Sequence, residues 1–595
     1  MTSLQPSSRP YARFIPRQAL LVASLLLITV YAACAGDPLG ATLHKDGTTT
    51  FRVWAPGVDK VAVKIGTRAP LALSKEAGND DADTTWTATA KGTKAGNQYR
   101  YVIQSGGSSH EFNDPRAQQL TGFDLNAKSV IIDPGLAMPP FTEPTFNALV
   151  IYELHIGTFN KTFAGAVKQL DYLKGLGINA VEVLPIAQNP EYSDHTPNDY
   201  DWGYDPVQLF AVKAKYGTVA QFKEFVKQCH QRGIAVIVDV VYNHLIGNNL
   251  LKAFGGVAPA SIPNGIYFYG DERADTGFGP RPDFGRPQVR KYLNDNALVL
   301  LRDYGVDGLR FDDTVDIRTY NNSSGRQTNP EGAQLLREVN GSYRTTDPKQ
   351  PGKITIAEDL QSSGEVTQHT GPSALDFNSQ WDDGFFSSIR SAVVAVRDED
   401  RNLYAIKEAL ERKLSGDVFS RVIYTENHDK VGHPENGERR LPGLIDGGNP
   451  ESVFAKKRST LAAALLLTAP GIPMLFQGQE MLENRDFTFK TAVNVDFQRV
   501  RDAKYSGIVQ MYRDLIALWR NAGGSTRGLT GQQLNVFHLD DGTKTLAFHR
   551  WENGGAGDDV VVVANLSNTP QSSLNIGMPR GGALGGAFQQ RREGI

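Results

Sequence analysis

Hydrophobic and polar positions follow two different patterns along this chain. From about residue 41 to residue 135, short runs alternate between apolar and polar side chains, and turns rich in Gly, Pro and Asp separate them. Such alternation is typical of strands that are buried on one face only. The runs are TTTFRVWAP, KVAVKIG, TTWTATA and NQYRYVIQ, which begin at residues 48, 60, 84 and 97. We therefore predict a small β-sandwich over residues 37–137.

From about residue 148 the pattern changes, and mostly apolar runs alternate with stretches of helical spacing such as AVKQLDYLKGLG. Runs without strict alternation are typical of parallel strands that are buried on both faces. The eight runs are LVIYELHIG, INAVEVLPI, IAVIVDVVY, VDGLRFD, ITIAEDL, SALDFNS, RVIYTEN and IPMLFQG. Eight strands joined by helices predict an α/β fold, a (β/α)8 TIM barrel over residues 145–525. A stretch rich in Gly, Pro and Tyr, at about 246–288, is predicted to be a loop excursion after the third strand.

The C-terminal segment returns to a strand pattern. QLNVFHLDD, TLAFHRW and DDVVVVANLS follow one another from residue 533, but the run from Ala583 to Ile595 lacks strand alternation. We predict a C-terminal β-sandwich over residues 528–595 that is truncated, because the further strands of a complete sandwich are missing from the pattern.

The N-terminal residues have the pattern of an export signal. Three arginines precede an uncharged run of twelve residues, 19–30, which is short for a membrane span and typical of a signal-peptide core. Ala33 and Ala35 then form a small-residue cleavage pattern. We predict a signal peptide over residues 1–35 and an exported protein, periplasmic or extracellular. Two alternatives stay open: acylation at Cys34, which would give a lipid anchor and the protein's only membrane contact, and an uncleaved anchor.

Charge and cysteine content narrow the classes of function. Lys and Arg number 62 against 65 Asp and Glu, so the formal net charge is -3. This balance gives no electrostatic footprint for nucleic acid and favours a small polar ligand or a neutral polymer. The two cysteines, Cys34 and Cys229, exclude a disulfide framework in the mature chain. Cys229 lies in an amphipathic helical pattern and is predicted to be a buried core thiol.

The fourth apolar run carries a candidate nucleophile. It ends near Asp312 in the stretch VDGLRFDDTVDIR, and alternation along a strand puts Arg310 and Asp312 on one face and Asp313 on the other. A cation beside a carboxylate keeps it ionised, as a nucleophile requires. Such a pair alone is more often a structural salt bridge. The other acids of this stretch, Asp313 included, are interpreted as solvated or structural.

Other predicted strands also end in polar side chains. The third ends in Asp239, Asn243 and His244, the fifth in Glu358, and the seventh in a cluster of Glu426, His428 and Asp429. Each of these is separately compatible with helix capping. In a barrel, however, the carboxyl ends of all strands meet at one mouth. Clustered acids there repel and raise each other's pKa, an expense that is characteristic of active sites.

In their order and spacing, DVVYNH, GLRFD, IAEDL and ENHD resemble the four signature regions of the α-amylase superfamily, glycoside hydrolase family 13. FRVWAPGVDKVAVKI and NDPRAQQL are similar to the N-terminal carbohydrate-binding-type sandwich of branching and debranching enzymes. YELHIGTF and WGYDPVQLFAVKAKYGT resemble branching enzymes and trehalose-releasing hydrolases. The later run AKKRSTLAAALLLTAPGIPMLFQGQEML resembles branching enzymes most closely.

The resemblance implies roles for single residues and a retaining mechanism. We predict no cofactor and no metal ligands, because hydrolysis needs no metal and no calcium-loop pattern is evident, but the metal requirement stays open. The resemblance makes Asp312 the nucleophile, Glu358 the general acid/base and Asp429 a third carboxylate that grips sugar hydroxyls. The remaining candidates would bind substrate or support the site: Tyr204 by stacking on the sugar ring, Asp239 beside Arg310, and His244 and His428 by hydrogen bonds to hydroxyls.

Three functions remain open at the level of sequence. The leading interpretation is a 1,4-α-glucan branching enzyme, which moves α-1,4 chains to 6-hydroxyls. The predicted export favours the alternative of an α-glucan hydrolase of amylase, debranching or trehalose-releasing type. A non-catalytic glycan-binding scaffold is disfavoured because all three carboxylates are present. In each case the partner is an α-glucan, and the oligomeric state stays open.

Overall fold

The computed structural model describes most of the chain after the predicted signal segment. The described residues are 37–77, 83–122, 126–133, 135, 137–189, 202–246, 249–255, 265–344, 353–488, 493–578 and 585–586. The predicted signal peptide, with Cys34, lies outside them, and so does most of the C-terminal run after Met578. Among the described residues, no helix combines the length and the apolar character that a membrane crossing needs.

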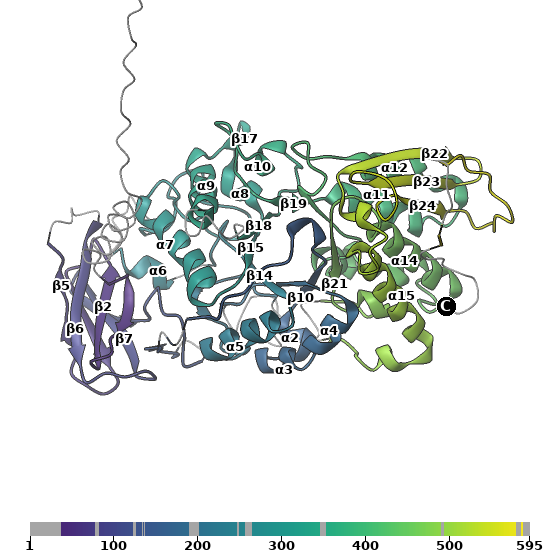
Figure 1. Cartoon of the computed structure of the whole chain (residues 1–595). Helices are drawn as coiled ribbons and strands as arrows, with labels where there is room; N and C mark the ends of the chain where they lie inside the picture. Colours follow the sequence, from purple (N-terminus) through teal and green to yellow (C-terminus); the bar gives the residue numbers. More distant parts are fainter. Residues whose placement is uncertain are drawn as a thin grey trace, which may run out of the picture.

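Two antiparallel sheets form the N-terminal part of the chain, at one end of the molecule (Figure 1). One has the order β1-β2-β6-β5, and the other has the order β4-β3-β7-β8 with β9 paired to β7. The four predicted runs correspond to β2, β3, β6 and β7, and in β2, β3 and β7 the burial alternates as the sequence does. The strands are β1 (Gly40–Leu43), β2 (Thr48–Trp54), β3 (Lys60–Ile65), β4 (Leu71–Ala72), β5 (Ser74–Lys75), β6 (Thr85–Lys91), β7 (Gln98–Ser105), β8 (Ser108–Phe112) and β9 (Ser129–Val130).

The middle of the chain is a closed barrel of eight parallel strands, as predicted. All of their residues are buried, which explains why the sequence runs are apolar rather than alternating. At Gly308 a Cβ atom would meet the Ile354 carbonyl oxygen at 2.5 Å, so this strand needs glycine where it approaches its neighbour. The strands are β10 (Ile151–Leu154), β11 (Ala180–Val183), β14 (Ala235–Val240), β15 (Gly308–Phe311), β18 (Ile354–Ala357), β19 (Ser379–Trp381), β20 (Arg421–Ile423) and β21 (Ile472–Phe476).

Helices connect the barrel strands and cover their outer faces (Figure 1). The helix before the third strand, α5 (Val219–His230), shows why these segments are helical. Thr218 and Gln221 form a capping box at its start, and its buried side chains, Cys229 among them, lie on one face. The helices are α2 (Ile156–Asn160), α3 (Phe163–Val167), α4 (Leu170–Leu176), α5 (Val219–His230), α6 (Asn249–Ala253), α7 (Pro287–Leu298), α8 (Thr314–Arg318), α9 (Pro330–Arg344), α10 (Gly364–Thr367), α11 (Asp383–Val394), α12 (Leu403–Glu411), α13 (Leu441–Ile445), α14 (Val453–Leu466) and α15 (Ala503–Trp519).

The sixth barrel strand lies later in the chain than the predicted run SALDFNS, so the expected boundaries of this strand were wrong. β19 begins at Ser379, the last residue of that run, and ends at Trp381. Asp376 has a φ of 67°, a left-handed conformation that interrupts an extended strand. Phe377 is nevertheless fully buried. The apolar residues of the run are therefore buried in a loop that precedes the strand, and the alternation of Leu, Asp, Phe and Asn does not mark a strand.

The remaining strands lie outside the barrel. Two short hairpins, β12 (Ala187–Gln188) with β13 (Gln208–Val212) and β16 (Thr319–Asn322) with β17 (Gly325–Thr328), lie in barrel loops. A three-stranded antiparallel sheet follows α15, at the end of the molecule opposite the N-terminal sheets (Figure 1). Its strands are β22 (Gln533–Asp540), β23 (Thr545–Trp551) and β24 (Val560–Asn565), in agreement with the three predicted runs.

Candidate active site

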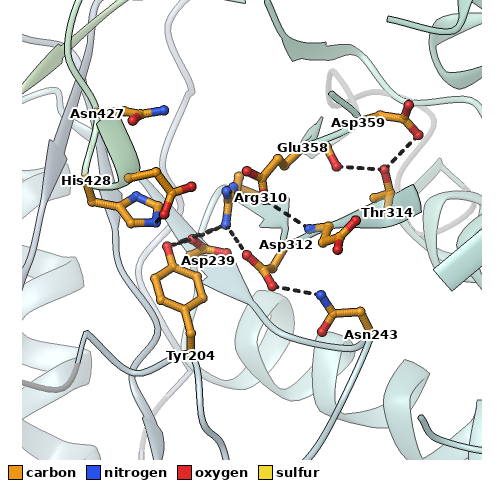
Figure 2. Close-up of polar contacts among 12 residues, drawn as sticks. Tyr204, Asp239, Asn243, Arg310, Asp312, Thr314, Glu358, Asp359, Asn427 and His428 are labelled. Atoms are coloured by element: carbon orange, nitrogen blue, oxygen red, sulfur yellow. Dashed lines mark hydrogen bonds and ion pairs between the residues drawn. The ribbon is translucent and has the colours of Figure 1, made fainter. Parts of the chain in front are cut away.

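Five barrel strands direct polar side chains into one mouth of the barrel. Glu153 belongs to β10, Asp239 to β14 and Arg310 to β15, whereas Glu358 directly follows β18 and His428 follows β20. Asp239 and Arg310 occupy the same level, because the register of β14 and β15 pairs them directly. Figure 2 shows four of these side chains, Asp239, Arg310, Glu358 and His428, converging from their separate strands. The barrel thus brings together residues that are up to 275 positions apart in the sequence.

Arg310 is the centre of this arrangement. Its side chain is fully buried, and its guanidinium contacts three carboxyl groups (Figure 2). Nη1 lies 2.6 Å from Oδ2 of Asp239 and 3.0 Å from Oδ1 of Asp312, and Nη2 lies 2.8 Å from Oε2 of Glu358. The ring of Trp381 covers the guanidinium at 4.1 Å. A buried cation with these partners holds three acids together that would otherwise repel each other.

Asp312 is held from both sides. One of its carboxylate oxygens accepts a hydrogen bond from Arg310, and the other accepts one of 2.9 Å from Nδ2 of Asn243. Asn243 is fixed in turn, since its Oδ1 lies 2.6 Å from Nδ1 of His244. Only 14% of the Asp312 side chain is exposed. This carboxyl group is therefore oriented by two partners and only partly exposed.

Glu358 has the environment of an acid that keeps its proton. Burial raises the pKa of its carboxyl group well above the usual range, and the charges of Asp312 and Asp429 raise it further, although Arg310 acts in the opposite direction. Oε2 accepts a hydrogen bond of 3.0 Å from the backbone N–H of Asp313. That contact and the one with Arg310 fix Oε2, so the group has a defined orientation beside Asp312.

Asp429 and His428 form a second charged pair at the mouth. Oδ1 of Asp429 lies 3.3 Å from Nε2 of His428, whose Nδ1 lies 2.6 Å from Oε1 of Glu153. Partial burial alone would raise the pKa of Asp429, but the neighbouring His428, with help from Arg310 and Lys430, holds that pKa below its ordinary value. Burial likewise opposes the charged form of His428, but Asp429 and Glu153 raise its pKa well above the usual range. Asp429 is consequently a carboxylate, and His428 a cation.

Tyr204 and His244 complete the set of predicted residues. The Tyr204 hydroxyl donates a hydrogen bond of 2.5 Å to Oδ2 of Asp239, and its ring lies parallel to the His428 imidazole at 4.8 Å. Burial raises the pKa of Asp239 to about 6, against the lowering effect of Arg310. His244 is buried beside Asn243, and its Nε2 lies 3.9 Å from Asp205. The structure therefore places all eight predicted residues at one mouth; stacking of Tyr204 on a sugar stays a prediction.

The remaining charges of the stretch VDGLRFDDTVDIR have structural partners. Asp313 caps α8 by accepting a hydrogen bond from the Asp316 backbone N–H, and Asp316 lies 3.9 Å from Arg281. Arg318 binds Asp359, at 2.7 Å. At the other end of β15, Asp307 binds His230 at 2.8 Å. Burial and the neighbouring acids Asp316 and Asp312 raise the pKa of Asp313 to about 7.

The chain and its fold resemble known proteins. The family model described as alpha amylase, catalytic domain, matches residues 152–252 and 279–514. The chain belongs to the α-amylase family. A malto-oligosyltrehalose trehalohydrolase of Saccharolobus solfataricus is 31% identical over 482 residues, which are 76% of this chain and 76% of that protein. A 1,4-alpha-glucan branching enzyme of Paramagnetospirillum magneticum is 26% identical over 607 residues, covering 92% of this chain and 75% of that protein.

Among solved structures, a pullulanase of Anoxybacillus sp. in complex with maltotetraose superimposes with a TM-score of 0.70. The match covers 91% of this chain and 84% of the pullulanase, at 20% sequence identity. It supports the α-amylase fold of this chain and nothing finer. The family assignment and the (β/α)8 barrel predicted from the sequence are thereby confirmed.

Two side chains of this α-amylase site were missed by sequence reasoning. Glu153 holds His428 through its carboxylate, and Trp381 covers Arg310. The run YELHIG contains Glu153, and its position at the end of the first strand was the signal that could have found it. Trp381 was missed because the sixth strand was placed too early. Glu182, the direct neighbour of Glu153 in the β10–β11 register, is also buried; burial and Glu153 raise its pKa well above the usual range.

The arrangement suits acid-assisted substitution at a carbon atom between Asp312 and Glu358. One planar guanidinium bridges the two carboxyl groups, so they lie close together, as the pair of a retaining glycosidase does. The charged groups of the site form ion pairs with one another. Among the described residues, no cluster of His, Cys, Asp and Glu has the arrangement of a metal site.

Proposed function

We propose that this protein is a retaining enzyme that acts on α-glucans, with Asp312 as nucleophile and Glu358 as general acid/base. The observation that carries the proposal is the shared Arg310, which contacts an oriented carboxylate with one nitrogen and a carboxyl group of raised pKa with the other. Two acids in such different environments are suited to opposite tasks. Membership of the α-amylase family supplies the substrate class.

The proposed reaction has two steps. Asp312 attacks the anomeric carbon while the Glu358 carboxyl group gives its proton to the departing glycosidic oxygen, and a glycosyl ester forms on Asp312. In the second step Glu358, now a carboxylate, takes a proton from the acceptor hydroxyl, which attacks the same carbon and releases Asp312. The two inversions leave the α-configuration unchanged. Asp429 and the cationic His428 lie where they can bind hydroxyls of the sugar in the mouth.

The acceptor decides between two candidate activities. Branching, the leading prediction from the sequence, uses a glucan 6-hydroxyl, and it is supported by the branching enzyme that aligns with 92% of this chain. Hydrolysis uses water, and it is favoured by the higher identity, 31%, to the trehalohydrolase. The carboxylates are the same in both reactions, so the difference lies in how well the site holds a hydroxyl group against bulk water.

The test is product analysis on amylose. Branching breaks one α-1,4 bond and makes one α-1,6 bond, so iodine staining should fall with little rise in reducing ends. A later isoamylase digest should then release short chains. Hydrolysis should raise reducing ends in step with the loss of staining and leave no isoamylase-sensitive branches, which would exclude branching.

Two further arms complete the test. Malto-oligosyltrehalose, incubated in the same way, should release trehalose if the chain has the activity of its 31% identical relative. The Glu358→Gln variant serves as the control for contaminating activities, since it keeps the size of the side chain but has no proton to give. If the wild-type protein changes none of these substrates, the assignment to α-glucans is wrong.

A further inference from the structure

Phe278 is an aromatic side chain in an unusual position. Its exposed fraction is 65%, and among the described residues it is the most exposed aromatic side chain. Its ring centre lies 5.9 Å from that of His244, with the two planes inclined by 37°. His244 binds Asn243, and Asn243 binds the nucleophile Asp312. An exposed apolar ring is thus only two side chains away from the reacting carboxylate.

The loop that carries Phe278 is held in place by its own hydrogen bonds. The Thr276 hydroxyl oxygen accepts from the backbone N–H groups of Phe278 and Gly279, both at 3.2 Å, and donates to the Gly279 carbonyl at 2.9 Å. Asp275 caps the turn by accepting from the Gly277 N–H at 2.8 Å. Gly277 has a φ of 86°, a conformation that favours glycine. The exposed ring is consequently displayed by a defined turn.

The same turn is attached to the site. The backbone N–H of Leu245, next to His244, donates to the Pro280 carbonyl at 3.1 Å. At Gly279 a Cβ atom would lie 3.1 Å from the His244 ring, a tight contact, so the turn passes close to that ring. The neighbouring Arg281 is buried and lies 3.9 Å from Asp316 of α8. The position of Phe278 is therefore fixed relative to both His244 and the start of α8.

We propose that Phe278 is a sugar-binding platform: it stacks against the glucosyl unit next to the one held between Asp312 and Glu358. A glucose ring presents a face of C–H groups to an aromatic ring, and burying both removes apolar surface from water. Binding sites for polar ligands commonly combine such aromatic faces with a few oriented polar groups. The inference rests on the proposed α-glucan substrate, but it does not depend on whether the acceptor is water or a hydroxyl group.

The experiment measures maltoheptaose binding by calorimetry in the inactive Glu358→Gln background, so that turnover does not interfere. Phe278→Ala should raise the dissociation constant about tenfold, since the apolar surface that the ring buries against the sugar is lost. Phe278→Trp should bind within about twofold of the parent, while Phe278→Leu, apolar but not flat, should lose most of the affinity. Because Phe278 is largely exposed, none of the three changes should lower the melting temperature.

Phe454→Ala is the matched control. Phe454 has a similar exposed fraction, 59%, but it lies on α14 over Arg458, which binds Asn568 beside the C-terminal sheet. Its replacement should leave the affinity unchanged. If Phe278→Ala binds maltoheptaose as tightly as the parent, or Phe278→Leu is as good as Phe, the platform is refuted while the α-glucan assignment stands. If the parent itself binds no maltoheptaose, both the platform and the proposed function fail.

Discussion

Asparagine at position 312 should abolish turnover while leaving the fold nearly intact. The amide oxygen can still accept the hydrogen bond from Arg310, but the amide nitrogen then meets Nδ2 of Asn243, a donor against a donor. Asn243 cannot simply turn over, because its oxygen is bonded to His244. The loss is one net hydrogen bond, about 1 kcal/mol of stability. Without a nucleophile no glycosyl ester can form, and turnover should fall at least about 10⁴-fold, equivalent to ~5.5 kcal/mol.

Asp313→Asn is the control for this prediction. Asp313 caps α8, and asparagine caps a helix about as well as aspartate, so stability should change little. Its backbone N–H, which binds Glu358, is untouched by the substitution. Turnover should therefore stay within about threefold of the wild type, or ~0.65 kcal/mol. Initial rates on maltoheptaose and thermal melts of the three proteins provide the measurement; comparable rate losses in both variants would refute the assignment of Asp312.

Two other outcomes are expected. Glu358 must be protonated in the first step, and burial raises its pKa, so kcat/KM should fall as the pH rises through that pKa. The Glu358→Gln variant should not show this fall in its residual activity on a substrate with an activated leaving group. If the variant shows the same fall at alkaline pH, the fall belongs to another residue. For the predicted export, mass spectrometry of the native protein should find a terminus near Gly36, or an acylated Cys34, and an intact segment 1–30 would contradict it.

The barrel could be predicted from sequence because its strands are buried on both faces. Seven of the eight apolar runs contain the strand that the structure assigns to them, since burial on both faces favours apolar residues along most of such a run. The sixth strand failed because β19 has only the residues Ser379–Trp381, two of them polar, while its apolar predecessor Phe377 lies in a loop. The pattern of apolar residues reports burial and not backbone conformation, so a buried loop and a short strand have the same sequence pattern.

The sequence predicted those site residues that can be recognised from their position in a single strand run. Arg310 and Asp312 share one strand face, and Glu358 and Asp429 follow strand ends, so each was visible in its own run. Glu153 also lies near the end of its strand, which is the one local signal it leaves. Its role could not be predicted from that run, because it depends on His428, 275 residues later in the chain. That contact needs the closed barrel, in which β10 pairs with β21.

In the proposed mechanism, the shared guanidinium allows Glu358 to act first as an acid and then as a base. Before the reaction, the negative charge of Asp312 contributes to the raised pKa of Glu358, while Arg310 opposes it. When Asp312 becomes a glycosyl ester, that charge disappears, but Arg310 stays 2.8 Å from Oε2 of Glu358. The pKa of Glu358 must therefore fall in the intermediate. The group has then lost its own proton to the departing oxygen, and its lowered pKa keeps it a carboxylate until the acceptor hydroxyl arrives.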